Sequence, residues 1–313
     1  MTETREEAVA VKTQHLAEPA ARHLGGAPDH LAQSPLAMAW RRLRRDRMGM
    51  VGLALVICLS LVAIFAPWVA PYDPITDYNL RNRLQPPSKE HWLGTDASGR
   101  DVFSRIVYGA RISLTVGLVS RLVTLVLGVG LGALAGYFAG TWVDMLVMRL
   151  SEIVDALPSL FVAIAIAVAL GPGIYTVFIA LGFVGWANMC RLIRGQVLTI
   201  REEQFVEAAR AIGCSTGRIV FRHILPQVMA PIIVSLTMGI AGAIMAETAL
   251  SFLGLGAQPP TPTWGSMMNY ARQYIYTAPH LVFAPGVAIL ITVYAFNLLG
   301  DGLRDALDPR TKA

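Results

Sequence analysis

The chain has 313 residues, of which 54% are hydrophobic and 15% charged, against about 25% charged residues in a typical soluble domain. Its mean hydropathy of +0.52 and its long uncharged windows exclude an ordinary soluble domain, because about 20 consecutive apolar residues form a membrane-spanning helix. The net charge of +5 does not imply nucleic-acid binding, since the basic residues border the apolar windows and favour a membrane surface. We therefore predict an all-α polytopic membrane protein.

The N-terminal segment 1–40 is polar and rich in alanine and histidine, and it lacks the apolar core of a signal peptide. We predict a disordered cytoplasmic tail without a cleaved leader. Its three histidines are seven and eight residues apart, a spacing that does not favour a metal site. The cysteines Cys58, Cys190 and Cys214 occupy apolar or cytoplasmic positions and imply no disulfide framework.

Six transmembrane helices are predicted, at about 48–67, 116–139, 145–170, 174–194, 227–250 and 281–300. The third and fourth are separated at Gly171–Gly173, because Gly-Pro-Gly is a strong turn signal. The third must include Arg149, Glu152 and Asp155 to be long enough, and charges near a helix end can reach the headgroups.

The distribution of lysine and arginine predicts the orientation. Fifteen of these residues border the spans on the side of the N-terminus, and seven lie on the other side. Because cytoplasmic loops carry the excess of positive charge, we place both termini, the loop 201–226 and the C-terminal segment 301–313 in the cytoplasm. The segment 68–115 is expected to be extracytoplasmic, and the core 116–300 lies in the cytoplasmic membrane.

Four glycines, Gly128, Gly132, Gly136 and Gly140, recur every four residues in the second span. On a helix they form a flat stripe where another backbone can approach closely. The stripe predicts either helix packing within the chain or an interface with a second membrane subunit. Arg121 of the same span is expected to extend outward to the headgroups, or else to face a translocation passage.

The loop 201–226 contains the stretch "EAARAIGCSTGRIVFRHILP". One helical face carries, at positions i, i+3, i+4 and i+7, Phe205, Ala208, Ala209 and Ile212. Gly213 is suited to end this helix, Ser215 to begin a second short one, and Pro226 to begin the next span. We predict two short helices below the membrane, whose small alanines admit a foreign surface. The alternative is an amphipathic helix resting on lipid headgroups.

This stretch resembles the EAA loop of ABC importer permeases: Glu-Ala-Ala, a glycine four residues after the second alanine, and then Ile-Leu-Pro. Four further stretches resemble the C-type permease subunit of dipeptide and oligopeptide importers: "HWLGTDASGRDVFSRIVYGARISL", "AGYFAGTWVD", "LSFLGLGAQPPTPTWGSM" and "NLLGDGLRDALDPR". The resemblance covers about residues 34–310, and Trp92 departs from the family pattern.

The resemblance implies the ABC importer type I transmembrane fold and a complex of several chains. A related B-type permease would complete the passage, ATP-binding subunits would bind ATP and magnesium, and an extracytoplasmic binding protein would deliver the substrate. The contact with the ATPase subunits would involve Glu207, Ala208, Ala209, Arg210, Gly213 and Arg218. Peptides are the expected substrates, and glutathione, nickel or metal chelates are the alternatives within the family.

The sequence contains no phosphate-binding G-x-x-x-x-G-K-[ST] motif and no hydrolase motif, so we expect no catalytic site and no cofactor in this chain. A secondary transporter is disfavoured because its spans would need midplane ionisable residues. Candidate passage residues are the polar or soft side chains within spans, although helix packing also explains them: Asn188, Ser235, Met238, Met245, Glu247 and Asn297. Glu247, at the outer end of the fifth span, is the favoured candidate to line the exit of the binding protein.

Overall fold

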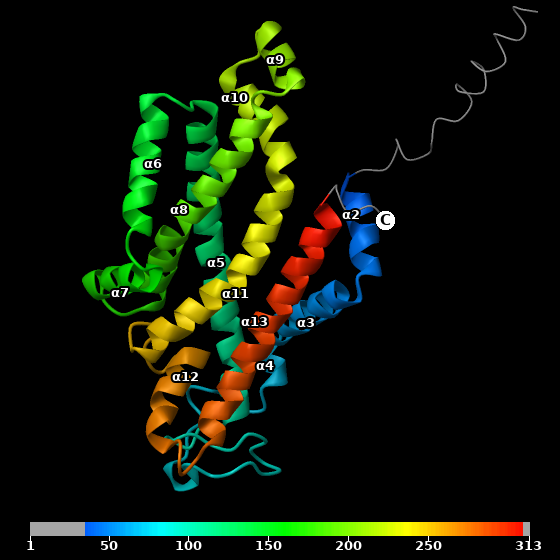
Figure 1. The fold of residues 1–313 in the computed structure, drawn as a ribbon. Coiled ribbons are helices and arrows are strands. Elements are labelled where there is room, and N and C mark those ends of the chain that lie inside the picture. Colours follow the sequence, from blue (N-terminus) through cyan, green and yellow to red (C-terminus); the bar gives the residue numbers. More distant parts are fainter. Residues whose placement is uncertain (1–34, 309–313) are drawn as a thin grey trace, which may run out of the picture.

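Long apolar helices make up most of the described chain (Figure 1). A computed structural model describes residues 35–308, so positions 1–34 of the predicted tail lie outside the described residues. Positions 35–40 are not part of a tail, because they begin helix α2, Pro35–Arg45. The helices able to cross a bilayer are α3 (Arg47–Ile64), α5 (Val102–Tyr137), α8 (Ile174–Ile200), the run Thr216–Phe252 and α13 (His280–Leu307).

The third predicted span, 145–170, is not one straight helix. It consists of α6, Trp142–Asp155, and α7, Ser159–Leu170, which together are apolar enough for one span but meet at 90°. Pro158 stands at the break. A proline has no backbone N–H to continue a helix, and it disfavours helical geometry in the residue before it. Figure 1 shows α7 lying across the bundle while α6 runs along it.

Short helical elements connect these spans. They are α4 (Ala66–Val69), η2 (Leu80–Asn82), α9 (Gln204–Ala211), α12 (Trp264–Ala271) and η5 (Arg272–Tyr274). The fifth span, Thr216–Phe252, consists of α10 (Thr216–Arg218), η3 (Ile219–Ile224), η4 (Leu225–Val228) and α11 (Met229–Phe252). Between residues 35 and 308 the only β-type pairing is an isolated bridge between Thr95 and Asp101. The predicted all-α class is confirmed.

The glycine stripe packs α5 against α8 of the same chain. A Cβ atom added at Gly128 would lie 2.5 Å from Cβ of Met189, and one at Gly136 would lie 2.7 Å from Cβ of Val197. Between them, a Cβ at Gly132 would lie 2.5 Å from a backbone oxygen of α8. Real Cβ atoms do not come this close to other heavy atoms, so these three positions admit only glycine. The stripe is therefore part of the chain's own core.

Gly140, the fourth glycine of the predicted stripe, has a different role. It lies beyond the end of α5 with φ of +82°, and its N–H donates to Oδ2 of Asp144 at 3.1 Å. The same carboxylate accepts hydrogen bonds from Nε and Nη2 of Arg194 at 2.6 and 2.8 Å. This bidentate ion pair joins α6 to α8.

Helices α5 and α11 run antiparallel. Ser113 of α5 meets Glu247 of α11, and two turns further along α5 Arg121 meets Gly239. At another crossing, a Cβ added at Gly302 of α13 would lie 2.6 Å from the Cα of Gly49 in α3. Glycines thus allow close backbone approach at more than one helix pair of the bundle.

Helix α5 begins fourteen residues before the predicted start of the second span at 116, inside the segment expected to be extracytoplasmic. Asp101 caps it, because its carboxylate accepts from the N–H and the hydroxyl of Ser104 at 2.8 Å each. His91 Nδ1 lies 3.0 Å from the other oxygen of Asp101. The stretch "HWLGTDASGRD" thereby builds the N-terminus of a long helix, and it lies at the end of the bundle opposite α9 (Figure 1).

Candidate functional site

The short helix α9 projects from one end of the bundle, beyond the ends of α5 and α8 (Figure 1). Its inner face carries Val206 and Ala209, both buried, which pack in one cluster with Ile219, Ile224 and Val228 at the start of the fifth span. The loop is therefore fixed by its own apolar contacts. A movement of α9 would be transmitted to the fifth span through this cluster.

Gly213 ends α9 in the way its sequence predicts. Its φ is +78°, its N–H donates to the carbonyl of Arg210 at 3.0 Å, and the N–H of Cys214 donates to the carbonyl of Ala209 at 3.0 Å. This pair of hydrogen bonds is a Schellman motif, which requires a left-handed residue at that position. A Cβ at Gly213 would meet no atom within 4 Å, so the requirement is purely conformational.

Two arginines fix the loop to the end of α5. Nη1 of Arg201 lies 3.3 Å from the carbonyl oxygens of Gly136 and Tyr137, which satisfies acceptors at the helix terminus. The guanidinium of Arg210 lies over the ring of Tyr137, 5.5 Å from its centroid. Arg210, predicted as a contact with another subunit, is thus also part of the internal support of α9.

The outer face of α9 is apolar and uncovered. Phe205 is 42% exposed and Ile212 81% exposed, and Ala208 between them is also exposed. We call these three residues the α9 face. Glu207 and Arg218 are exposed nearby in sequence, and neither forms an ion pair with any residue of the range 35–308. An apolar face with charged neighbours on a fixed short helix has the form of a docking element for another protein.

Two predictions about this loop are wrong. Ala209 is buried rather than presented with Ala208, because the inner face of the helix passes through positions 206 and 209. The second short helix is not separate either, since α10 continues without a break through η3 and η4 into α11. Pro226 lacks an N–H for the helical ladder, and the π-helical and 3₁₀ turns around it absorb this defect within a single 37-residue run.

The predicted role of Glu247 is contradicted by its position. Its side chain is 1% exposed and accepts from Ser251 Oγ at 2.7 Å and Ser113 Oγ at 3.4 Å. The carboxylate faces the interior between α5 and α11, so it lines no open surface of this chain. An uncharged window in the sequence locates a span, but it does not show the direction of each side chain within that span.

The other candidate passage residues are divided between packing and exposure. Met238 lies against Gly300 of α13, which identifies it as a packing residue. Asn188 is exposed and accepts from Nη2 of Arg191 at 2.8 Å. Ser235 and Asn297 are partly buried. Met245 is 51% exposed on α11.

Arg121 does not extend outward to the headgroups, so the first of the two alternatives predicted for it is wrong. It turns into the bundle and donates from Nε to the carbonyl oxygen of Gly239 at 2.6 Å. The glycine leaves room for the guanidinium beside the backbone of α11. An outward path to the headgroups is the usual expectation for arginine, and the absence of a side chain on the facing helix is what permits the inward one.

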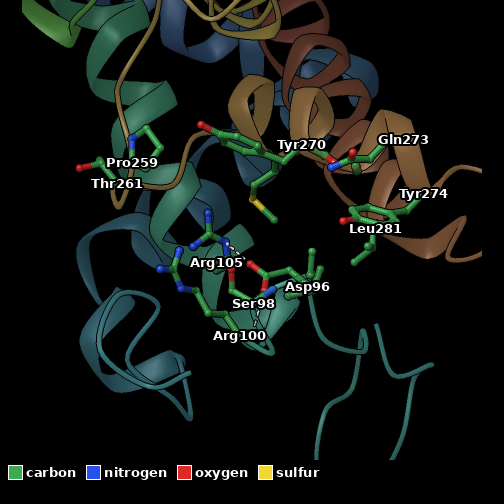
Figure 2. A pocket seen from close by; sticks show the side chains of 14 residues that line it. Asp96, Ser98, Arg100, Arg105, Pro259, Thr261, Tyr270, Gln273, Tyr274 and Leu281 are labelled. Atoms are coloured by element: carbon green, nitrogen blue, oxygen red, sulfur yellow. Dashed lines mark hydrogen bonds and ion pairs between the residues drawn. The ribbon is translucent and has the colours of Figure 1, made fainter. Parts of the chain in front are cut away.

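At the end of the bundle opposite α9, a cavity of about 250 Å³ lies between residues 96–105, the loop 259–261 and α12. Figure 2 shows Arg100 and Arg105 projecting into it from one side and Tyr270 from the other. Arg105 is 5% exposed, and it pairs with Asp96 at 3.5 Å and with the carbonyl of Pro74 at 3.2 Å. Nε of Arg100 is buried without a hydrogen-bond partner in the described part of the chain. The recess can accept an acidic group.

This cavity was not predicted, because its walls come from segments that are more than 150 residues apart in the sequence. The only signal for this cavity in the sequence is the pair of arginines in "SGRDVFSR". Within residues 35–308, no group of three or more His, Cys, Asp or Glu side chains is placed to hold a metal ion.

Residues 128–313 match the family model described as binding-protein-dependent transport system inner membrane component, and residues 34–87 match the N-terminal TM domain of oligopeptide transport permease C. The chain is 48% identical over 284 residues to the dipeptide transport system permease protein DppC of Alkalihalophilus pseudofirmus, covering 91% of this chain and 93% of that protein. It is 47% identical over 285 residues to the glutathione transport system permease protein GsiD of Escherichia coli, with the same coverage of each chain.

Among solved structures, the MetNI methionine ABC transporter in an inward-facing conformation matches with a TM-score of 0.54, covering 66% of this chain and 97% of that chain. At 20% identity this likeness shows a shared fold alone. The family models and the curated relatives extend over the bundle and the α9 loop together. The chain therefore belongs to the binding-protein-dependent transport system inner membrane component family, as an ABC importer permease of the oligopeptide permease C type.

Proposed function

We propose that this chain imports peptides together with a second, B-type permease, and that α9 couples the passage to separate ATP-binding subunits. ATP and magnesium would bind to those subunits, and this chain would hold no cofactor of its own. A substrate-binding protein would dock at the opposite end of the bundle, where the cavity beside Arg100 and Arg105 supplies positive charge. The relatives' names favour a dipeptide, with glutathione as the alternative.

The observation that carries the coupling proposal is the α9 face. It is apolar and exposed, yet the helix that bears it is held by buried contacts, by the Schellman turn at Gly213 and by the two arginines on α5. A mobile segment would absorb an applied displacement, whereas a fixed one passes it on to the helices that hold it. Closure of the ATPase subunits would therefore reach α8 and the fifth span as a rigid movement.

Replacing Ala208 by tryptophan tests this proposal. In a groove shaped for a methyl group, the larger side chain prevents docking, so association with the ATP-binding subunits and coupled transport should both fall. A helix resting on lipid headgroups would accept tryptophan readily. Ala54→Trp is the matched control, because Ala54 is exposed on α3, a helix that lies away from α9 (Figure 1). Normal association and transport by Ala208→Trp would leave only the lipid-surface interpretation.

We further propose that the chain is a multi-pass protein of the cytoplasmic membrane with the α9 end and both termini inside. The arginine distribution supports this orientation. So does the position of α2 beside the C-terminal end of α13, where Nη1 of Arg42 donates to the carbonyl of Asp308 at 2.8 Å. Single cysteines at 260–275 should react with an impermeant thiol reagent in intact cells, and cysteines at 205–220 should not.

Uptake into proteoliposomes containing the whole complex identifies the substrate. Labelled dialanine and labelled glutathione are supplied in parallel with the cognate binding protein, and mass spectrometry of that protein's bound ligand provides an independent assignment. Retention of a dipeptide with ATP-dependent uptake of dialanine is the expected result. Retention of a metal chelate, with no uptake of either peptide, would contradict the peptide assignment while leaving the coupling proposal intact.

A further inference from the structure

Arg121 is an isolated charge near the middle of α5. It is the only charged residue between Arg111 and Asp144, and it meets α11 at Gly239, also near the middle of that helix. Charged side chains within a transmembrane span are rare; they face the bundle interior or a water-filled cavity, and they mark substrate or ion pathways. The surroundings of the Arg121 guanidinium therefore indicate whether this residue takes part in transport.

Glycines from two helices form a cradle around the guanidinium. A Cβ added at Gly239 would lie 2.6 Å from Nε and 2.7 Å from Cζ of Arg121. One at Gly242 would lie 3.5 Å from Nη2, and one at Gly185 of α8 would lie 3.4 Å from Nη1. A side chain at Gly239 would displace the head group, whereas the Cβ atoms at Gly242 and Gly185 would be in ordinary van der Waals contact with it. The glycine at 239 therefore provides the space that the guanidinium occupies.

The charge of Arg121 is not balanced within residues 35–308, where it belongs to no ion pair. The only acidic residue of α11, Glu247, is two turns away and bonded to Ser113 and Ser251. A guanidinium has five N–H donors, and one hydrogen bond to Gly239 uses only one of them. Leaving the others in hydrocarbon would be costly, so this position requires contact with water or with an anion.

The cradle borders a half-buried to exposed stripe of α11. Ser235, Gly239, Gly242 and Met245 are spaced by four, three and three residues, which places them on one helical face. Each of them is partly or fully exposed, as is Arg121. A stripe of small and soft residues with one hydroxyl and one guanidinium suits a passage for a polar solute better than it suits lipid.

We propose that Arg121 binds the carboxylate of the transported peptide as it crosses the membrane. The planar guanidinium pairs with a carboxylate in a bidentate geometry, and a free C-terminal carboxylate is common to the peptides considered above. The inference rests on the proposed function, because it assigns a step of peptide transport to one residue of this chain. The site holds the anion transiently, since the remaining walls of the stripe are uncharged and let it leave.

Transport by the reconstituted whole complex tests the proposal. For Arg121→Met, the KM for uptake of labelled dialanine should rise, or the rate fall, by about tenfold or more, the effect of losing a charge-assisted hydrogen bond. Arg121→Lys, which keeps the positive charge, should recover part of the activity. Arg111→Met is the control, because Arg111 is exposed on the same helix near its start. A role in packing alone would lower complex assembly and would not be rescued by lysine.

Thiol labelling tests the site without relying on uptake. In a chain with Cys58, Cys190 and Cys214 replaced, Arg121→Cys should react with an anionic methanethiosulfonate, and saturating dialanine with binding protein and ATP should slow that reaction. If wild-type complex takes up no dialanine, the peptide assignment fails, and reaction of the cysteine with the anionic reagent then shows only that position 121 lies in a passage that is open to water. Wild-type uptake by Arg121→Met, or a thiol that does not react under any condition, overturns the proposal. Arg121 would then serve only in packing α5 against α11, or would pair permanently with a carboxylate of the second permease.

Discussion

Gly132→Leu should separate α5 from α8 and destabilise the bundle. Even the first carbon of the new side chain would lie 2.5 Å from the carbonyl oxygen of Cys190 and 3.0 Å from Cβ of Ile193. Both neighbours are residues of α8, and a backbone carbonyl within a helix cannot rotate away as a side chain can. Overpacking a core by extra methylenes costs about 1–3 kcal/mol, and leucine adds four carbons. A loss of about 3 kcal/mol or more is therefore expected, reduced by about 1 kcal/mol because glycine is a poor helix former.

Gly130→Leu is the matched control. Gly130 lies two residues earlier on the same helix and has no atom within 4 Å of an added Cβ. It should gain helix propensity without overpacking, so its stability should equal or exceed that of the wild type. Thermal unfolding of the purified permease pair, followed by size-exclusion chromatography, measures both variants under identical conditions. Equal melting temperatures for Gly132→Leu and Gly130→Leu would refute the assignment of the stripe to the α5–α8 contact.

The loop and the α6–α8 ion pair yield two further predictions. Gly213→Val should cost about 1–2 kcal/mol locally, because a β-branched residue is strained at φ of +78°; substrate-stimulated ATPase activity should fall, while Gly217→Val, with open space and no positive φ, should retain it. Asp144→Asn should lower unfolding stability by about 1.5–3 kcal/mol, since it removes the charge that receives both nitrogens of Arg194. Glu152→Gln in an exposed pair should change it by less than about 1 kcal/mol, and equal effects of the two substitutions would contradict the ranking.

The spans were predictable because a bilayer imposes a simple requirement on composition. Uncharged windows located four of the six predicted spans as single helices within a few residues at most ends, for example Arg47–Ile64 against the predicted 48–67. The same criterion placed the start of α5 too late. Counting charged residues places the start of this span after Arg111. The N-cap signal of Asp101 and Ser104, which is also present in the sequence, marks the true start of the helix. Pro158 likewise marked the break in the third span.

The candidate site was predictable where one local motif determines it. Gly213 ends α9 through hydrogen bonds made within six residues, so its role follows from local sequence. The direction of a side chain depends on what faces it, and periodicity alone does not supply that information. Ala209 turns inward because the fifth span offers an apolar cluster, Glu247 because α5 offers a serine, and Arg121 because α8 and α11 offer glycines. These partners lie between 10 and 134 residues away in the sequence.

Photo-crosslinking from the α9 face tests the central claim most directly. A photoreactive amino acid is placed at Ala208 in the assembled complex in membranes, and the covalent products are identified by mass spectrometry with and without ATP. The proposed coupling predicts a crosslink to an ATP-binding subunit whose yield changes with ATP, and no such product from the same amino acid at Ala54. Crosslinks only to lipid, at both positions and irrespective of ATP, would show that α9 rests on the membrane surface and transmits nothing.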